Sequence, residues 1–263
     1  VFCTPCELDE TAHSQYDATN LALFGEVDFA LTERVELTAG LRFERRTADY
    51  AESFGNRFEP TDRMLGGELA LAWNFAEPWT TYLRLARGYK AGGFNVSFAG
   101  VDFDQVDNVT PAQIEFDPES LESLEAGIKG VWLDGRIRGE IGVFAARRDD
   151  QQVKIPLQLT LGDPSSFLFL TENAERGRHR GAEASVEYRA AESLTVSASL
   201  GLLDTEIEEF SLYPALEGRA QAHAPRSSFG LAAEYRPAGG WWGRVDVMGR
   251  SDFYFDYSHD QKS

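Results

Sequence analysis

The sequence predicts an all-β protein, an antiparallel up-and-down transmembrane β-barrel. Three observations support this fold class: apolar and polar residues alternate with period two along many segments, very short turns alternate with long polar connections, and aromatic residues gather at the segment ends. Alternation alone would also fit a soluble β-sandwich, whose strands bury one face against a second sheet. The other two observations favour the barrel, because aromatic rings concentrate at the two membrane interfaces.

The segment 35–44 shows the alternation clearly. Val35 and Leu37 share one face of the expected strand, and Glu36 and Thr38 share the other. In a barrel the apolar face would meet lipid and the polar face would line the interior. The same pattern predicts about ten strands, at 21–31, 35–44, 68–75, 79–88, 123–132, 136–146, 181–189, 194–203, 228–235 and 241–253.

The connections between these segments are of two kinds. The short ones lie at 32–34, 77–78, 134–135, 192–193 and 238–240. The long ones run over 49–63, 89–119, 149–177 and 205–226. Tight turns on one side and long loops on the other are typical of outer-membrane barrels. Aromatic residues lie at or near the strand ends, at Trp73, Phe75, Trp79, Tyr89, Trp132, Tyr188, Tyr235, Trp241, Trp242, Phe253 and Tyr254.

Composition excludes several other classes of protein. The chain of 263 residues carries a formal net charge of −18, which opposes binding to a nucleic-acid backbone, so no nucleic-acid partner is expected. No run of apolar residues approaches the 18 or more that a transmembrane helix needs. Barrel strands are apolar on one face only and do not form such runs, so this observation does not exclude a β-barrel.

Residues suited to catalysis or metal binding do not form a recognisable site. Cys3 and Cys6 fit a small loop disulfide, unpaired thiols, or redox or metal chemistry, and no second cysteine pair completes a zinc site. The histidines are scattered, and no nucleophile is spaced with a base. We therefore expect no enzyme activity, no cofactor and no metal site.

Three sequence motifs resemble one family. The run 82–95, YLRLARGYKAGGFN, is similar to a strand-to-loop segment of TonB-dependent outer-membrane receptors. The run 116–129, FDPESLESLEAGIK, resembles the strand entry that follows in that family, and 173–183, NAERGRHRGAE, resembles a later segment. The three occur in the family's order, each on or beside an alternating segment.

The resemblance implies a 22-strand barrel with an N-terminal plug domain inside it. The sequence holds about ten of those strands, so we expect residues 1–263 to be a partial barrel domain, with loop segments at 1–18 and 256–263. It departs from the family at both ends. Nothing before the first strand resembles a plug, and the chain does not end in an aromatic strand.

The implied function is active uptake of a scarce substrate, typically a ferric siderophore or similar iron complex, in the bacterial outer membrane. The TonB–ExbB–ExbD complex would supply energy through the plug. Substrate contact is expected in the connections 89–119 and 149–177 and, near the first motif, at Arg84, Tyr89, Lys90, Phe94 and Asn95. Two alternatives stay open: a passive porin, and a soluble β-sandwich with a binding role.

Charged residues on the polar face are expected to line the lumen and meet the plug. They are Glu26, Arg42, Glu68, Glu125, Lys129, Arg138, Glu183 and Arg244.

One basic cluster lies at 176–180, near Arg147 and Arg148 in strand order. Alternation places Arg147, Arg178 and Arg180 on the outer face near the external rim. Contact with lipopolysaccharide phosphates and outer-membrane lipid, a solvated charged loop, and capture of an anionic ligand are the three interpretations.

Overall fold

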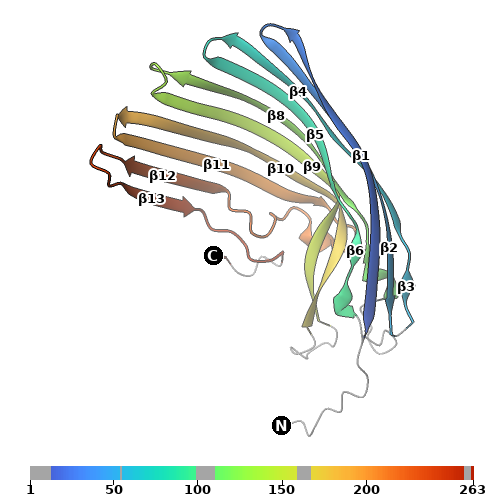
Figure 1. The fold of residues 1–263 in the computed structure, drawn as a ribbon. Helices are drawn as coiled ribbons and strands as arrows, with labels where there is room; N and C mark the ends of the chain where they lie inside the picture. The colour runs from blue at the N-terminus through green and yellow to red at the C-terminus, as the bar shows by residue number, and fades with distance from the viewer. Residues whose placement is uncertain (1–12, 54, 99–109, 159–166, 258–261) are drawn as a thin grey trace, which may run out of the picture.

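The computed structural model describes residues 13–53, 55–98, 110–158, 167–257 and 262–263. They form one curved antiparallel sheet of 11 strands in the order β1-β2-β4-β5-β8-β9-β10-β11-β12-β13, with β3 paired to β2 (Figure 1). Successive strands of this path pair with each other, as in an up-and-down barrel. Within the described residues the sheet is open, with β1 and β13 at its two edges.

The strands of the main sheet are β1 (Ser14–Thr32), β2 (Val35–Glu52), β3 (Arg57–Phe58), β4 (Thr61–Ala76), β5 (Trp79–Lys90), β8 (Glu119–Trp132), β9 (Ile137–Gln158), β10 (Phe167–Ala191), β11 (Leu194–Glu209), β12 (Ser227–Tyr235) and β13 (Gly243–Arg250). A separate two-stranded sheet pairs β6 (Gly93–Phe94) with β7 (Glu115–Phe116). The short 3-10 helices are η1 (Val96–Phe98), η2 (Pro111–Ile114) and η3 (Pro214–Leu216). Among the described residues, no helix has the length and apolar character needed to cross a membrane.

The predicted strands are all present, but most are longer than expected at the long-connection end. There β2, β9 and β11 continue to Glu52, Gln158 and Glu209, and β4, β8 and β10 begin at Thr61, Glu119 and Phe167. Strand β1 begins at Ser14, so residues 14–18 belong to the strand although we expected a loop over 1–18. The last strand covers Gly243–Arg250, which is shorter than the expected 241–253. Residues 1–12 and 258–261, including half of the second expected end loop, lie outside the described part.

The outer face of the sheet is a continuous band of exposed apolar side chains. On β4 this face carries Leu65, Leu69, Leu71 and Trp73, which are 38% to 50% exposed. The register sets Leu71 opposite Leu37 on β2 and Leu83 on β5, so apolar residues face outward on neighbouring strands as well. No second layer covers this band in the described residues. Such exposure of apolar side chains would be unfavourable in water, but it is what the outer wall of a barrel requires in lipid.

Aromatic side chains line the end of the band next to the short turns. Trp79 and Trp132 meet edge to face with 4.5 Å between ring centroids, and Trp73 lies 5.6 Å from Phe75. Tyr235 and Trp241 form a further pair at 5.3 Å. This row is the aromatic girdle expected at one membrane interface.

At the opposite end, the band stops on most strands at a charged residue. Following the outward positions from β2 to β11, the first charged residues are Arg45, Arg63, Arg87, Glu122, Arg147, Arg180 and Asp204. We call this set the boundary row. It marks the level at which the strands leave the apolar layer on the side of the long connections.

Strands β9 and β10 extend far beyond the boundary row, and this corrects the prediction of a loop over 149–177. Residues 149–158 and 167–177 are strand and form a long hairpin. One buried cluster joins Leu170 to Tyr50, Phe98 and Ile114. The buried residues Gln151, Val153, Ile155, Leu170 and Ala174 share one face of the hairpin, whereas Lys154 and Phe169 on the other face are exposed.

A second buried cluster lies where β9, β10 and β11 meet the segment that follows β11. It contains Val153, Ile155, Ala174, Ile207 and Phe210. Both clusters are beyond the boundary row. Within the described residues, the two packed clusters thus lie at the long-connection end, and the wall that carries the apolar band has no such cluster.

Candidate functional site

The concave face of the sheet carries the charged residues expected in the lumen. Cross-strand register places all of the predicted set on the face opposite the apolar band: Glu26, Arg42, Glu68, Glu125, Lys129, Arg138, Glu183 and Arg244. Several form ion pairs with neighbours on the same face. Arg84 Nε lies 2.6 Å from Glu68 Oε2, and Arg244 Nη2 lies 2.7 Å from Asp246 Oδ1.

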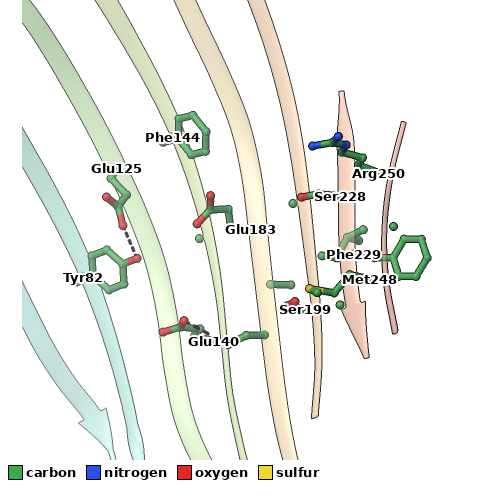
Figure 2. A pocket seen from close by; sticks show the side chains of 17 residues that line it. Tyr82, Glu125, Glu140, Phe144, Glu183, Ser199, Ser228, Phe229, Met248 and Arg250 are labelled. Atoms are coloured by element: carbon green, nitrogen blue, oxygen red, sulfur yellow. Dashed lines mark hydrogen bonds between the residues drawn. The ribbon is translucent and has the colours of Figure 1, made fainter. Parts of the chain in front are cut away.

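A cavity of about 1010 Å³ lies on this face between β5 and β13 (Figure 2). The carboxylates of Glu125, Glu140 and Glu183 line one side, and Arg250 approaches from β13. The Tyr82 hydroxyl donates a 2.6 Å hydrogen bond to Glu125 Oε1. This wall is acidic on one side and basic on the other, and it suits polar contacts with a hydrated or protein occupant.

Tyr82 owes its position to a glycine on the neighbouring strand. A Cβ at Gly127 would lie 2.6 Å from ring atoms of Tyr82, so any larger residue would displace the ring. With glycine at that position, the ring crosses β8 and its hydroxyl reaches Glu125. Glycine in a strand often marks such a close approach.

A second cavity of about 770 Å³ lies nearer the short turns. Lys129, Arg138 and Arg244 line it together with Glu140 and Asp246, so charges of both signs alternate across it. Of the predicted luminal residues, Glu125 and Glu183 line the acidic cavity, and Lys129, Arg138 and Arg244 line this mixed one. The other three, Glu26, Arg42 and Glu68, line neither cavity.

The residues expected to touch substrate do not form a single site. Arg84 lies on the luminal wall beside Glu68, far along β5 from the long connection. The Tyr89 hydroxyl accepts a 2.8 Å hydrogen bond from Arg42 and donates one of 2.8 Å to Glu44. Lys90 lines a small cavity of about 480 Å³ in the long-connection region.

Phe94 and Asn95 belong to the packed core of the long-connection end. Phe94 stacks on Tyr50 with 4.7 Å between ring centroids. Asn95 Nδ2 donates 2.8 Å hydrogen bonds to the carbonyl oxygens of Gln113 and Thr171, and Oδ1 accepts one of 2.7 Å from the Thr171 amide. These bonds tie the segment after β6 to β10.

A buried polar group joins β9 and β10 to the segment after β11. Gln221 Nε2 lies 2.6 Å from His179 Nε2 and donates a 3.1 Å hydrogen bond to Gln151. Burial, together with the positive charge of Arg148, lowers the pKa of His179 to about 4. His179 is therefore a neutral hydrogen-bonding partner at neutral pH and does not add to the basic cluster.

The outward arginines of the basic cluster are paired with carboxylates. Arg180 Nε lies 2.9 Å from Asp204 Oδ2, Arg147 Nη2 lies 2.9 Å from Asp149 Oδ2, and Arg178 forms ion pairs with Glu206 and Glu208. Register confirms that Arg147 and Arg178 share the outer face, where they stand directly opposite each other.

No group of three or more histidine, cysteine, aspartate or glutamate side chains able to hold a metal occurs in the described residues. Cys3 and Cys6, for which a disulfide was one interpretation, lie outside them. Sequence reasoning missed Tyr82 and Arg250 as members of the luminal cavity. Strand parity was the available signal, because it places Tyr82 on the polar face with Arg84 and Arg250 on the polar face with Arg244.

Comparison with known proteins gives consistent results. A family model described as TonB dependent receptor-like, beta-barrel, matches residues 5–262. The pesticin receptor of Yersinia enterocolitica is 31% identical over 93 residues, which make up 32% of this chain and 14% of that protein. The pesticin receptor of Yersinia pestis matches to the same extent.

Two solved structures illustrate the likeness of fold. The ferric yersiniabactin uptake receptor FyuA from Yersinia pestis gives a TM-score of 0.75 at 22% identity, covering 95% of this chain and 37% of that one. The siderophore receptor PiuA from Acinetobacter baumannii gives 0.69 at 16%, covering 95% and 35%. This chain therefore spans well under half the length of each. It belongs to the TonB-dependent receptor β-barrel family, whose members are transport receptors of the bacterial outer membrane.

Proposed function

We propose that the protein is an active transport receptor that imports a ferric siderophore or a similar iron complex across the outer membrane. The observation that carries the proposal is the combination of a charged concave wall with a packed long-connection end, where the β9–β10 hairpin extends beyond the boundary row. Such a wall suits a folded plug and a polar substrate. Energy would come from the TonB–ExbB–ExbD complex through the plug.

Several similar structures are named for iron uptake. They include the ferric yersiniabactin receptor, the siderophore receptor PiuA and the ferric citrate transporter FecA. One other is named as the copper transporter OprC. These names support a metal complex as the substrate class of this receptor, with iron complexes more frequent among them.

We assign first contact with the substrate to the cavity lined by Lys90 and Lys154. Both side chains are exposed, and Gln152 and Thr171 complete the lining with polar groups. Two ammonium groups at the outer opening would attract an anionic iron complex. Arg84 and Tyr89 lie deeper, on or next to the luminal wall, and would be reached later along the path.

The two alternatives predict different behaviour. A passive porin would admit small solutes without an energy source, whereas the two packed clusters at the long-connection end favour a gated path. A soluble sandwich would cover its apolar face with a second sheet, whereas Leu69 and its outward neighbours are exposed.

The test is uptake of radioactive iron by cells that lack their own siderophore receptors and express this receptor as its gene encodes it. Hydroxamate, catecholate and phenolate siderophores serve as separate probes. We expect uptake of one class, abolished by a protonophore or by loss of TonB. Uptake that survives both treatments would establish a porin, and no uptake of any iron complex would refute the proposed substrate.

The lysine cavity is tested in the same assay. Lys90→Gln with Lys154→Gln should raise the half-saturating concentration of the substrate about tenfold or more, since each lysine contributes a charge-assisted hydrogen bond. Arg57→Gln is the control, because Arg57 is exposed and engaged with Asp49 and Glu59 away from the cavity. Equal effects of the control and the double variant would contradict the assignment.

A further inference from the structure

Two arginines on the concave face of β2 hold the segment that carries Lys90. Arg42 Nε donates a 2.8 Å hydrogen bond to the hydroxyl of Tyr89, the residue before Lys90. Arg46 Nη1 donates a 2.7 Å hydrogen bond to the carbonyl oxygen of Gly92, which follows shortly after it. The chain is therefore bound to β2 on both sides of Lys90, whereas the Lys90 side chain is exposed.

Arg46 is the more buried of the two arginines, with a side chain that is 11% exposed against 44% for Arg42. Asp62 lies directly opposite on β4 and is 9% exposed, and its Oδ2 lies 3.1 Å from Arg46 Nη1. Arg46 Nη2 donates a hydrogen bond to the Tyr16 hydroxyl on β1. One guanidinium thus joins β1, β2 and β4 to Gly92, and its planar fork is held in one orientation by these partners.

The backbone around Gly92 is also confined from the side of β7 and β9. A Cβ at Gly92 would lie 2.6 Å from the carbonyl oxygen of Phe116, so no larger residue fits there. Gln152 Nε2 donates hydrogen bonds of 2.9 Å and 3.0 Å to the carbonyl oxygens of Ala91 and Asp117. All of these residues except Asp117 line the lysine cavity described above.

This confinement matters because the cavity brings two like charges together. The ammonium groups of Lys90 and Lys154 repel each other, so a lysine on a loose segment would move away from its partner when no anion is bound. An anion would then have to order that segment as it binds, which weakens its affinity. A fixed backbone removes this cost before the substrate arrives.

We propose that Arg46 is a positioning residue for first contact with the substrate: it fixes Gly92 and thereby keeps Lys90 beside Lys154. The inference rests on the proposed function, in which the lysine cavity receives an anionic iron complex. The Arg46 guanidinium is largely buried and already bonded within the protein, so it acts on the substrate through the backbone.

The first experiment measures uptake of radioactive iron by variants of the receptor expressed as its gene encodes it, with ferric hydroxamate, catecholate and phenolate siderophores as probes. Arg46→Gln is combined with Asp62→Asn, so that no buried carboxylate is left without its partner. We expect this pair variant to raise the half-saturating concentration about fivefold, since a fixed hydrogen bond is lost. Maximal uptake should stay unchanged, because the transport path is intact.

Three single substitutions are the controls. Asp62→Asn alone keeps the bond from Arg46 to Gly92 and should have little effect. Arg45→Gln should also have little effect, because Arg45 precedes Arg46 on β2 and is exposed on the opposite face. Arg46→Lys keeps the charge without the fork that reaches both Asp62 and Gly92, so an intermediate result is expected.

A double-mutant cycle with Lys90→Gln separates positioning from general stabilisation. If Arg46 acts through Lys90, the pair variant should have little further effect on the half-saturating concentration once Lys90 is replaced. A purely structural role would instead lower maximal uptake by the same factor in both backgrounds.

Hydrogen exchange on the purified receptor tests the anchor without any substrate. Exchange in 89–93 should accelerate in the pair variant and stay unchanged in Asp62→Asn and Arg45→Gln. Unchanged exchange in the pair variant would overturn the inference, and so would additive effects in the cycle. Failure of the proposed substrate contact is recognised separately: Lys90→Gln with Lys154→Gln would then leave uptake unaltered, while exchange in 89–93 would still report on Arg46.

Discussion

The role of a single residue depends on its tertiary surroundings. Asn95 lies in a motif that resembles a receptor signature, yet the residue is only 6% exposed and its side-chain amide is hydrogen-bonded to Gln113 and Thr171. Its neighbour Ser97 makes one bond of 3.1 Å, to the carbonyl of Phe169, from an exposed position. A motif residue can therefore stabilise the packed long-connection end, which we call the mouth. The motif alone does not distinguish this structural role from substrate binding.

His179 makes the mouth sensitive to acid. Its pKa in the folded mouth is about 4, lowered mainly by burial, against 6.5 for an exposed histidine. Between these pH values, His179 takes up a proton when the region is locally unfolded but not when it is folded. The stability of the folded region is therefore lost as the pH falls from about 6.5 towards 4. We expect hydrogen exchange in 205–226, corrected for intrinsic rates, to accelerate from pH 7 to pH 4.5.

His179→Gln is the control for this effect. Glutamine keeps a hydrogen-bonding partner for Gln221 and cannot titrate, so the corrected exchange should lose its pH dependence. Persistence of the same acceleration in this variant would assign it to another group.

At the scale of elements, the β9–β10 hairpin is held by two separate clusters. Leu170 packs with Phe98 and Ile114, whereas Ile207 packs with Val153 and Phe210. Neither cluster contains a residue of the other. We therefore expect that loosening one cluster leaves the other packed.

This separation gives a prediction. Leu170→Ala and Ile207→Ala should each cost about 2 to 5 kcal/mol of local stability, because each removes a fully buried side chain. Hydrogen exchange should rise in 93–98 and 110–116 for the first variant and in 210–216 for the second. Val96→Ala and Leu212→Ala, at positions more than half exposed, are the matched controls and should change little.

A rise in both segments from either substitution would show that the mouth opens as one unit. In that case the two clusters would be coupled through the hairpin backbone.

At the scale of the whole molecule, the wall is stabilised by lipid on one face and water on the other. Leu69→Arg places a charge near the middle of the band and should cost about 2 to 4 kcal/mol when the receptor folds into lipid vesicles. Ala70→Arg, one residue along and on the luminal face, should cost much less. Urea titration of folding in vesicles measures both, and equal costs would contradict the assignment of faces.

The wall was predictable from sequence, and the mouth was not. Residues such as Leu37 and Leu71 alternate with polar neighbours because one face meets lipid and the other water, and this condition appears directly in the sequence. In the β9–β10 extension, Val153 and Ile155 pack against a segment some fifty residues later in the chain. Such contacts depend on tertiary packing that local periodicity does not contain.

The same contrast applies to the candidate site. Strand parity was enough to predict that Glu125 and Glu183 lie on the luminal face. The cavity that they share with Tyr82 and Arg250 could not be predicted in this way, because it depends on the curvature of the sheet. The substrate residues inferred from the first motif were expected to act together. They lie in three separate places, because β5 carries Arg84 along the wall and the chain after Lys90 turns into the packed mouth.

The apolar band also determines which membrane the receptor fits. On β4 it runs from Leu65 to Phe75, and ten steps of about 3.4 Å at a tilt near 45° give a height of about 24 Å. A bilayer several Å thicker would draw the charges of the boundary row below its surface or force local thinning, with a cost for each Å of mismatch. The height of the apolar band thus matches the thin outer membrane, and the protein is less stable in a thicker bilayer.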